Sequence, residues 1–530
     1  MKLSAQTHNT IYFIALMMIA AGLPFWLLLI SFAEILLITN WVVEGNLKEK
    51  WKSFISQPAA IGLTSIYLLH LVGLIWTNED FSYALKDLRI KLPLLILPLV
   101  ISTSPKLTKK QLFQVLGVFI TAVFLASIVS VMSYYGVVGD APHDSREMSI
   151  FISHIRFSLL VSLAIFALFY IVFFYECNNA LKTLMLVVLV WLIIFLFFLK
   201  AMSGIVAFLI TLIVMLGYFA VRINNRTIRS LVVSALVIIP FFLGLYLVQL
   251  AIDFFQEKEE IRYNQLPKKT ADGEKYYHLY GNQQTENGYY VNYHIAPKEM
   301  HAAWEKRSNL NLEGTDKKEQ PLFETLKRFL TSKGLKKDRK GIEQLSEAEI
   351  EAIERGVANV KYLTSNSLEV RIHKILWEFD NYSKGMNPQG NSVTQRIEFW
   401  RAGLEIYKAN PVIGVGTGDV PPAFNKVYNK INSPLDTKYR LRGHNQYLTF
   451  ALTFGTVGLI WFLTAFLLPF FTRENARRYF YLTFFSIAAA SMINEDTLET
   501  QTGVTFFAFF AALFLFGYQC DKQNQLTTVR

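Results

Sequence analysis

The chain has 530 residues, of which 52% are hydrophobic and only 18% are charged, and its formal net charge is +11. Soluble domains carry about 25% charged residues, so the composition excludes an ordinary soluble globular protein. Many lysines and arginines fall in short segments between apolar runs, as membrane topology distributes them, and we expect no nucleic-acid partner.

Apolar runs of about 20 residues, long enough to cross a hydrocarbon core of about 30 Å as a helix, recur along the chain. Lipid offers the backbone no hydrogen-bond partners, so helices are the expected spanning form. We predict an all-α polytopic membrane protein with about 12 transmembrane helices and a large, partly helical periplasmic loop domain. The predicted spans are 9–22, 25–43, 58–76, 88–103, 111–135, 154–175, 181–199, 202–221, 230–251, 445–470, 478–494 and 502–518.

The positive-inside rule orients these spans, because one set of short loops concentrates lysine and arginine. That side is predicted to be cytoplasmic and to hold both termini, Cys177 and Cys520, so we expect no disulfide. The expected parts are a bundle of about nine spans at 1–251, the loop domain at 252–444, and the last spans with a cytoplasmic tail at 445–530. The basic loop residues are Lys48, Lys50, Lys52, Lys106, Lys109, Lys110, Arg222, Arg226, Arg229, Arg473, Arg477 and Arg478.

Two cations stand at the outer ends of spans: Arg156 begins the sixth and Lys200 ends the seventh. Each alone is compatible with a plain interface anchor. Together with Arg396 they can line one basic cavity above the membrane plane.

The loop at 252–444 is too long for a simple connection and indicates a functional or disordered segment. Ser346 and Glu349 form a capping box that predicts a helix running to about Arg355. The aromatic stretch 276–293 contains glycines and predicts a short strand pair.

Residues 392–409 are predicted to form an amphipathic helix, with Ser392 and Gln395 as a capping box and Pro411 after its end. Arg396 lies in the first turn, where the helix dipole disfavours a cation but favours a bound anion. A clamp on a diphosphate and a snorkelling surface arginine are both compatible with that position. The apolar stripe, expected on the membrane surface or the bundle top, is Ile397, Trp400, Leu404 and Tyr407.

His444 lies where the polar loop meets the tenth span. A histidine titrates near neutrality and can take a proton from a hydroxyl, although an interfacial histidine bonded to a carbonyl is the plain alternative. Arg440 and Arg442 lie within four residues of it, and arginine matches phosphate oxygens bidentately. The neighbours therefore favour a base beside an anion site.

A glycine-rich segment at 414–418 follows a helix rather than a strand, so it indicates a tight turn and not a dinucleotide site. Carboxylates in the last outer loop can bind Mg²⁺ or Mn²⁺, but a solvated acidic turn is the favoured interpretation, and we assign no metal or other cofactor. The residues assigned as possible acceptor-binding or structural groups are Asp419, Asn445, Glu495, Asp496 and Glu499.

The stretches QRIEFWRAGLEIYKANPVIGVGTGD at 395–419 and HNQYLTFALTFGTVGLI at 444–460 resemble the O-antigen ligase and polymerase superfamily of bacterial envelope proteins. The resemblance is close over 391–461 and loose over most of the chain. The stretch TLKRFLTSKGLKKDRKGIEQL at 325–345 is similar to the ligase branch found in Bacteroidetes.

Members of that superfamily transfer a glycan from undecaprenyl diphosphate to an acceptor hydroxyl on the periplasmic side, and they are viewed as metal-independent, inverting transferases. The resemblance implies that His444 is the family's essential histidine and Arg396 its loop-helix arginine. A further family arginine, in a Ser-Arg-Gly motif, is missing here because Ser203 stands at its position. Lys200 or Arg156 can take its role.

The resemblance thus implies a ligase in the bacterial inner membrane that moves a polysaccharide onto a hydroxyl of lipid A-core. Its active site would face the periplasm. An O-antigen polymerase or a protein O-oligosaccharyltransferase of the same superfamily is the alternative. An anion transporter, the remote alternative, predicts discontinuous spans with charges at mid-membrane. The expected diphosphate-binding residues are Arg156, Lys200, Arg440 and Arg442.

Overall fold

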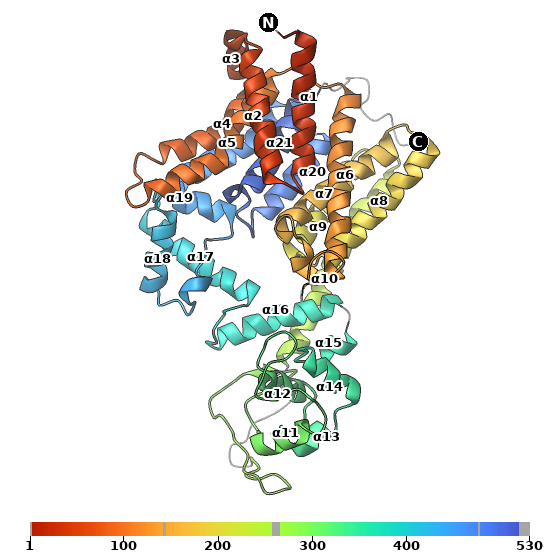
Figure 1. Cartoon of the computed structure of the whole chain (residues 1–530), viewed down its shortest axis with the longest axis vertical. Helices are drawn as coiled ribbons and strands as arrows, with labels where there is room; N and C mark the ends of the chain where they lie inside the picture. The colour runs from red at the N-terminus through yellow and green to blue at the C-terminus, as the bar shows by residue number, and fades with distance from the viewer. Residues whose placement is uncertain are drawn as a thin grey trace. The chain divides into compact units, whose positions relative to one another are not determined.

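The computed structural model describes residues 3–140, 142, 145–256, 266–365, 367–474 and 478–518 (Figure 1). This part of the chain is mostly helical, which confirms the predicted all-α class. Arg477, Cys520 and the tail after residue 518 lie outside the described residues.

Six described helices are long and apolar enough to cross a membrane, so the chain is an integral membrane protein by length and composition. A seventh candidate is α2 (Leu27–Val43) with α3 (Leu47–Ile55), which are bent 112° apart. The total of about 12 spans and the periplasmic loop domain stay predictions. The six helices are α6 (Lys109–Tyr134), α7 (His154–Phe174), α8 (Asn179–Phe198), α9 (Met202–Ala220), α10 (Arg226–Phe255) and α19 (Gln446–Thr472).

The chain divides into two compact units. Unit 1 comprises 1–236, 396–433 and 437–530, and unit 2 comprises 237–395 and 434–436. Residues 396–433 therefore cluster with the apolar helices, although they lie inside the predicted loop 252–444.

Unit 1 is built around α5 (Phe81–Thr103), which packs against α4 (Pro58–Val72) and α21 (Gln501–Leu515). The Asp80 side chain accepts from the Tyr83 backbone N–H and starts α5 seven residues before the predicted span. Further contacts join α1 to α2 and α6, α7 to α8 and α9, and α4 to α19. The remaining elements of this unit are α1 (Ala5–Gly22), η1 (Ser145–Met148), α18 (Val420–Lys430), η3 (Thr437–Tyr439), α20 (Tyr479–Ser491) and η5 (Thr497–Glu499).

Helix α19 is interrupted at Gly455, whose φ of 67° and ψ of −167° are not helical. The segment 411–416, which overlaps the glycine-rich segment 414–418, packs against this break and exchanges backbone hydrogen bonds with it. Val415 N–H donates to the Leu452 carbonyl at 3.0 Å, and Thr456 N–H donates to the Pro411 carbonyl at 2.8 Å. A break in an apolar helix leaves backbone groups that protein must satisfy, and this turn does so.

The helix predicted at 392–409 is α17 (Ser392–Ala409). Its buried side chains within unit 1 include Phe399, Ala402 and Ile406, whereas Leu404 is 47% exposed. The other three residues of the predicted stripe, Ile397, Trp400 and Tyr407, are half-buried, so the tightest packing involves the neighbouring face and the place of the stripe on the membrane surface or bundle top stays a prediction.

Unit 2 holds a small core around Trp304, Leu326 and Phe329. The capping box of Ser346 and Glu349 is present, which confirms the helix predicted there. Its elements are β1 (Thr285–Glu286), antiparallel to β2 (Tyr289–Tyr290), and helices α11 (Pro297–Trp304), α12 (Leu322–Ser332), α13 (Arg339–Glu343), α14 (Glu347–Glu354), α15 (Lys361–Thr364) and α16 (Ser367–Ser383).

We predict that Gly455→Ala destabilises unit 1 by about 2 kcal/mol or more, because a side chain at positive φ is strained. The added Cβ would also lie 2.1 Å from the backbone of Val412. Thermal melting of the purified protein in detergent measures the loss. Gly117→Ala on α6 is the matched control, since its Cβ meets nothing within 4 Å. Equal melting temperatures for both variants would contradict the packing of the segment 411–416 against the break in α19.

Candidate functional site

The carboxylate of Glu495 joins Arg396 and His444, the two residues that the sequence singled out. Arg396 Nη2 lies 2.7 Å from Glu495 Oε1, and His444 Nδ1 lies 3.5 Å from Oε2. Glu495 is buried in the loop between α20 and α21, whereas the Arg396 and His444 side chains are 24% and 31% exposed. A buried acid thus holds a partly exposed guanidinium and a partly exposed imidazole.

The backbone at His444 is held in the left-handed region, with φ of 44°. The Asp496 carboxylate accepts the backbone N–H groups of His444 and Asn445 at 3.0 and 3.1 Å, and the Thr449 hydroxyl at 2.7 Å. The His444 ring lies against Phe399 of α17, with ring centroids 5.5 Å apart. Strained backbone of this kind persists only where neighbours determine it, and it is concentrated at functional sites.

Electrostatics keep Glu495 ionised. Burial favours the neutral acid and would raise the pKa of Glu495, but His444 and Arg396 outweigh burial and lower it. Burial raises the pKa of the neighbouring Asp496 more than Arg442 lowers it. The two adjacent carboxyls therefore differ: the neighbours of Glu495 favour its ionised form, whereas burial disfavours the ionised form of Asp496, which accepts three hydrogen bonds.

A second group of paired charges centres on Glu499. Arg442 Nη1 and Lys91 Nζ both lie 2.9 Å from Glu499 Oε2, and Lys91 also pairs with Asp87 on α5 at 2.5 Å. Burial opposes ionisation, but the two cations hold the pKa of Glu499 well below its usual range. Arg442 further donates to the Tyr83 hydroxyl at 2.8 Å. This arginine is thus committed to internal partners, which does not favour the diphosphate role expected for it.

Arg156, at the start of α7, lines a small pocket with Glu495 and Asp496. Both carboxylates favour the charged form of the Arg156 guanidinium. Lys200 is exposed after α8, and no described contact links it to these carboxylates. Ser203 accepts a hydrogen bond from the Asn494 side chain at 3.1 Å. The structure therefore places Arg156, rather than Lys200, beside the Glu495 cluster.

Three further predicted residues have structural partners. Asn445 caps α19 by accepting from the Leu448 N–H at 2.9 Å, and Asp419 accepts the N–H groups of Asn78 and Glu79 at 2.8 Å each. Arg440 donates to Asn429 on α18, away from the described contacts of Glu495.

The solvated acidic turn favoured from the sequence is wrong, because Glu495 and Asp496 are 6% and 7% exposed. They are buried because cations and backbone donors surround them. Among the described residues, no group of three His, Cys, Asp or Glu side chains is arranged to hold a metal ion. Sequence reasoning missed the bridging position of Glu495, the contact of Phe399 and the role of Tyr83.

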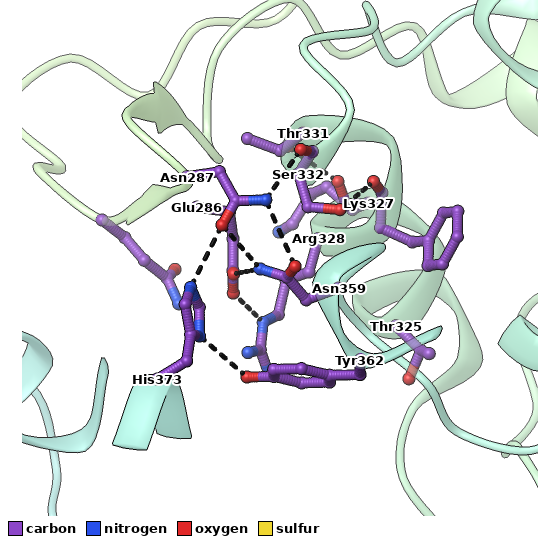
Figure 2. Close-up of polar contacts among 12 residues, drawn as sticks. Glu286, Asn287, Thr325, Lys327, Arg328, Thr331, Ser332, Asn359, Tyr362 and His373 are labelled. Carbon is purple, nitrogen blue, oxygen red and sulfur yellow. Dashed lines mark hydrogen bonds and ion pairs between the residues drawn. The ribbon is translucent and has the colours of Figure 1, made fainter. Parts of the chain in front are cut away.

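Unit 2 contains a separate polar network around Glu286 (Figure 2). The Glu286 carboxylate pairs with Arg328 Nε at 2.6 Å and accepts from Asn359 Nδ2 at 2.6 Å. Asn287 Oδ1 lies 3.1 Å from Nε2 of His373, whose pKa burial lowers to about 4. These side chains point toward one another rather than toward solvent, so we interpret the network as a structural clasp between β1, α12 and α16.

Residues 350–463 match the family model described as O-antigen ligase. The match confirms the resemblance to that superfamily and includes Arg396, Arg440, Arg442 and His444, but not Arg156, Glu495 or Glu499. A search of curated proteins found no match. The Bacteroidetes branch stays a prediction from the loop sequence.

We predict that Glu499→Gln lowers the free energy of unfolding at pH 7 by about 3 kcal/mol, because Arg442 and Lys91 would lose their shared counter-charge. A lowered folded-state pKa stabilises above the unfolded pKa of about 4.3, and the stabilisation fades as the pH falls below it. The gap between wild type and variant should therefore shrink on acidification.

Melting curves in detergent between neutral and acidic pH measure this gap. Glu474→Gln is the control, because the Glu474 side chain is 88% exposed and its pair with Arg478 should contribute little. A gap that grows as the pH falls would contradict the assigned direction of the pKa.

Proposed function

Given an O-antigen ligase domain at residues 350–463, we propose that the chain is a membrane glycosyltransferase that uses a lipid-diphosphate-linked glycan. The donor is a polysaccharide on undecaprenyl diphosphate, and the acceptor is a hydroxyl of lipid A-core. Transfer inverts the anomeric centre, at the periplasmic face of the inner membrane. The observation that carries the proposal is the Glu495 carboxylate between Arg396 and His444.

In this proposal His444 is the general base. The contact of Glu495 with Nδ1 favours a proton on that nitrogen, which leaves Nε2 to accept the proton of the acceptor hydroxyl. The alcohol oxygen forms a bond to the anomeric carbon as the bond to the diphosphate oxygen breaks. The ionised Glu495 stabilises the imidazolium that results. The contact of 3.5 Å is longer than an ordinary hydrogen bond, as catalytic contacts often are before substrate binds.

Arg396 stabilises the leaving diphosphate. Charge grows on that group as the glycosidic bond breaks, and a fixed guanidinium favours this change more than the starting state. A guanidinium carries five donors in a planar fork, enough to contact Glu495 and a phosphate oxygen together. We assign Arg156 as the second cation, because it shares a pocket with Glu495.

A polymerase or a protein-directed transferase would use the same residues. The loop stretch at 325–345, which is similar to the ligase branch, favours the lipid A-core acceptor over these alternatives. One feature expected of a transporter, a discontinuous apolar helix, is present as the break in α19. That break is filled by the segment 411–416, which contains no ionisable residue. Glu495 and His444 lie instead in the loops before α21 and α19, and Arg396 lies in the first part of α17, which favours a transferase.

We predict that His444→Ala lowers transfer by about a hundredfold or more, since general-base catalysis contributes about that much. Arg396→Lys should lose nearly as much, because lysine cannot form the fork. The measurement is the lipopolysaccharide profile of a deletion strain complemented with each variant at equal membrane levels. Core-only lipopolysaccharide with long glycan on undecaprenyl diphosphate supports the ligase.

Other profiles give other answers. Single repeat units on the core would indicate a polymerase, and an unchanged profile in the deletion strain would direct the search to protein acceptors. Normal ligation by both variants would remove the proposed site.

We also predict that Arg156→Gln reduces ligation by at least about tenfold, as loss of one group that stabilises developing charge does. Lys200→Gln is the matched control and should retain nearly full activity, because Lys200 is exposed. The readout is the amount of glycan-bearing lipopolysaccharide at equal protein level. A reversed order of effects would assign the missing arginine's role to Lys200.

A further inference from the structure

A short ribbon in unit 2 presents lysine and tyrosine side chains on one face. Lys269 pairs with Lys275 across an antiparallel bridge, and Tyr277 pairs with Ile295 across a second one. Tyr277 and Ile295 exchange both backbone hydrogen bonds, at 2.7 and 3.1 Å. We use the term lysine–tyrosine face for Lys269, Lys275 and Tyr277. Tyr280 lies beyond this ribbon, and its ring contacts His278 and Tyr293.

Strand geometry directs these side chains outward. Residues two apart share a face, so Lys275 and Tyr277 point the same way while Tyr276 points inward. Tyr276 is 5% exposed, whereas Tyr277 is 59% exposed.

The base of this face is rigid. His278 Nδ1 accepts from the His294 N–H at 3.2 Å, and its Nε2 lies 3.0 Å from the Pro267 carbonyl. The His278 ring also contacts the Tyr280 ring, with centroids 6.1 Å apart. A ligand that stacked on Tyr277 would therefore meet a residue whose backbone is already fixed by its hydrogen bonds to Ile295.

The lysine pair carries a charge cost. Residues directly opposite in an antiparallel pair have Cβ atoms about 5 Å apart, and like charges at that place destabilise the pair. Among the described residues, neither Lys269 nor Lys275 has an ion-pair partner.

The acids nearest in sequence are engaged elsewhere. Glu274 accepts two backbone N–H groups at the start of α11, and Asp272 pairs with Arg339 at 2.7 Å. The positive charge of the lysine–tyrosine face is therefore available to an anionic partner.

We propose that the lysine–tyrosine face binds an anionic polysaccharide. Ammonium groups attract carboxylate or phosphate groups on the sugars, and the phenol ring of Tyr277 stacks on the apolar C–H face of a pyranose ring. A lipid surface fits less well, because insertion scales with apolar area and Leu279 is the one exposed aliphatic residue between Tyr277 and Gln283.

This binding is independent of the proposed transfer reaction. The lysine–tyrosine face precedes the matched residues 350–463, and none of its residues belongs to the Glu495 cluster. An assay of binding alone therefore tests it, and its failure would leave the transferase proposal unchanged.

The test uses the full chain in phosphatidylcholine nanodiscs, with fluorescent dextran sulfate as the anionic probe and uncharged dextran for comparison. The variant Lys269→Gln with Lys275→Gln should weaken dextran sulfate binding at least about fivefold, the sum of two surface charge interactions. Tyr277→Ala should weaken it by about threefold, through lost ring contacts.

The matched control is Lys306→Gln with Lys317→Gln, which removes two exposed lysines of the same unit. It should bind like the wild type. An equal loss in this control, or no loss in the tyrosine variant, would overturn the proposal and leave general attraction of a basic chain. If the lysine variant retained dextran sulfate binding but lost binding to phosphatidylglycerol vesicles, the proposal would be overturned in favour of a lipid surface.

The melting temperature of the lysine variant separates a loss of binding from a loss of folding. Removal of two opposed positive charges should leave the melting temperature equal or higher, because their repulsion disappears. A lower melting temperature in the lysine variant would contradict the charge cost on which the proposal rests.

Discussion

The constraint on which the rest of the site depends is that a buried carboxylate must be compensated. An ionised acid removed from water is costly unless cations and donors surround it. Glu495 meets this requirement through its contacts with Arg396 on α17 and with His444 in the loop before α19. Its neighbour Asp496 fixes the backbone at His444 and Asn445. One acidic dipeptide thus assembles three segments that are distant in the chain.

The sequence predicted those features that have local signatures. Apolar runs predicted the helical class, the Ser346 capping box predicted α14, and the motif around His444 predicted the neighbourhood of the site. The bridge by Glu495 had no such signature, because its arginine partner lies 99 residues away. Acids between two apolar runs usually face water, so their burial followed only from tertiary contacts. The break at Gly455 was hidden for a related reason, since an apolar run does not reveal which turn packs against it.

The family match and the charged site do not coincide. Residues 350–463 contain the histidine and the loop-helix arginine, whereas Glu495, Glu499 and Arg156 come from helices or loops outside that range. In unit 2 the clasp of Figure 2 similarly joins Glu286 and Arg328, which precede the match, to Asn359 and His373 within it. Residues that precede or follow the matched segment therefore complete both clusters, so the match alone describes neither.

The interlock between the segment 411–416 and α19 also has a consequence for biogenesis. The glycine-rich turn is synthesised before α19, and its carbonyl and N–H groups are the ones that complete the helix at Gly455. An apolar helix with an unsatisfied break is a poor substrate for release into lipid. We therefore expect α19 to leave the insertion machinery together with the preceding turn, as one unit, rather than as an independent hydrophobic segment.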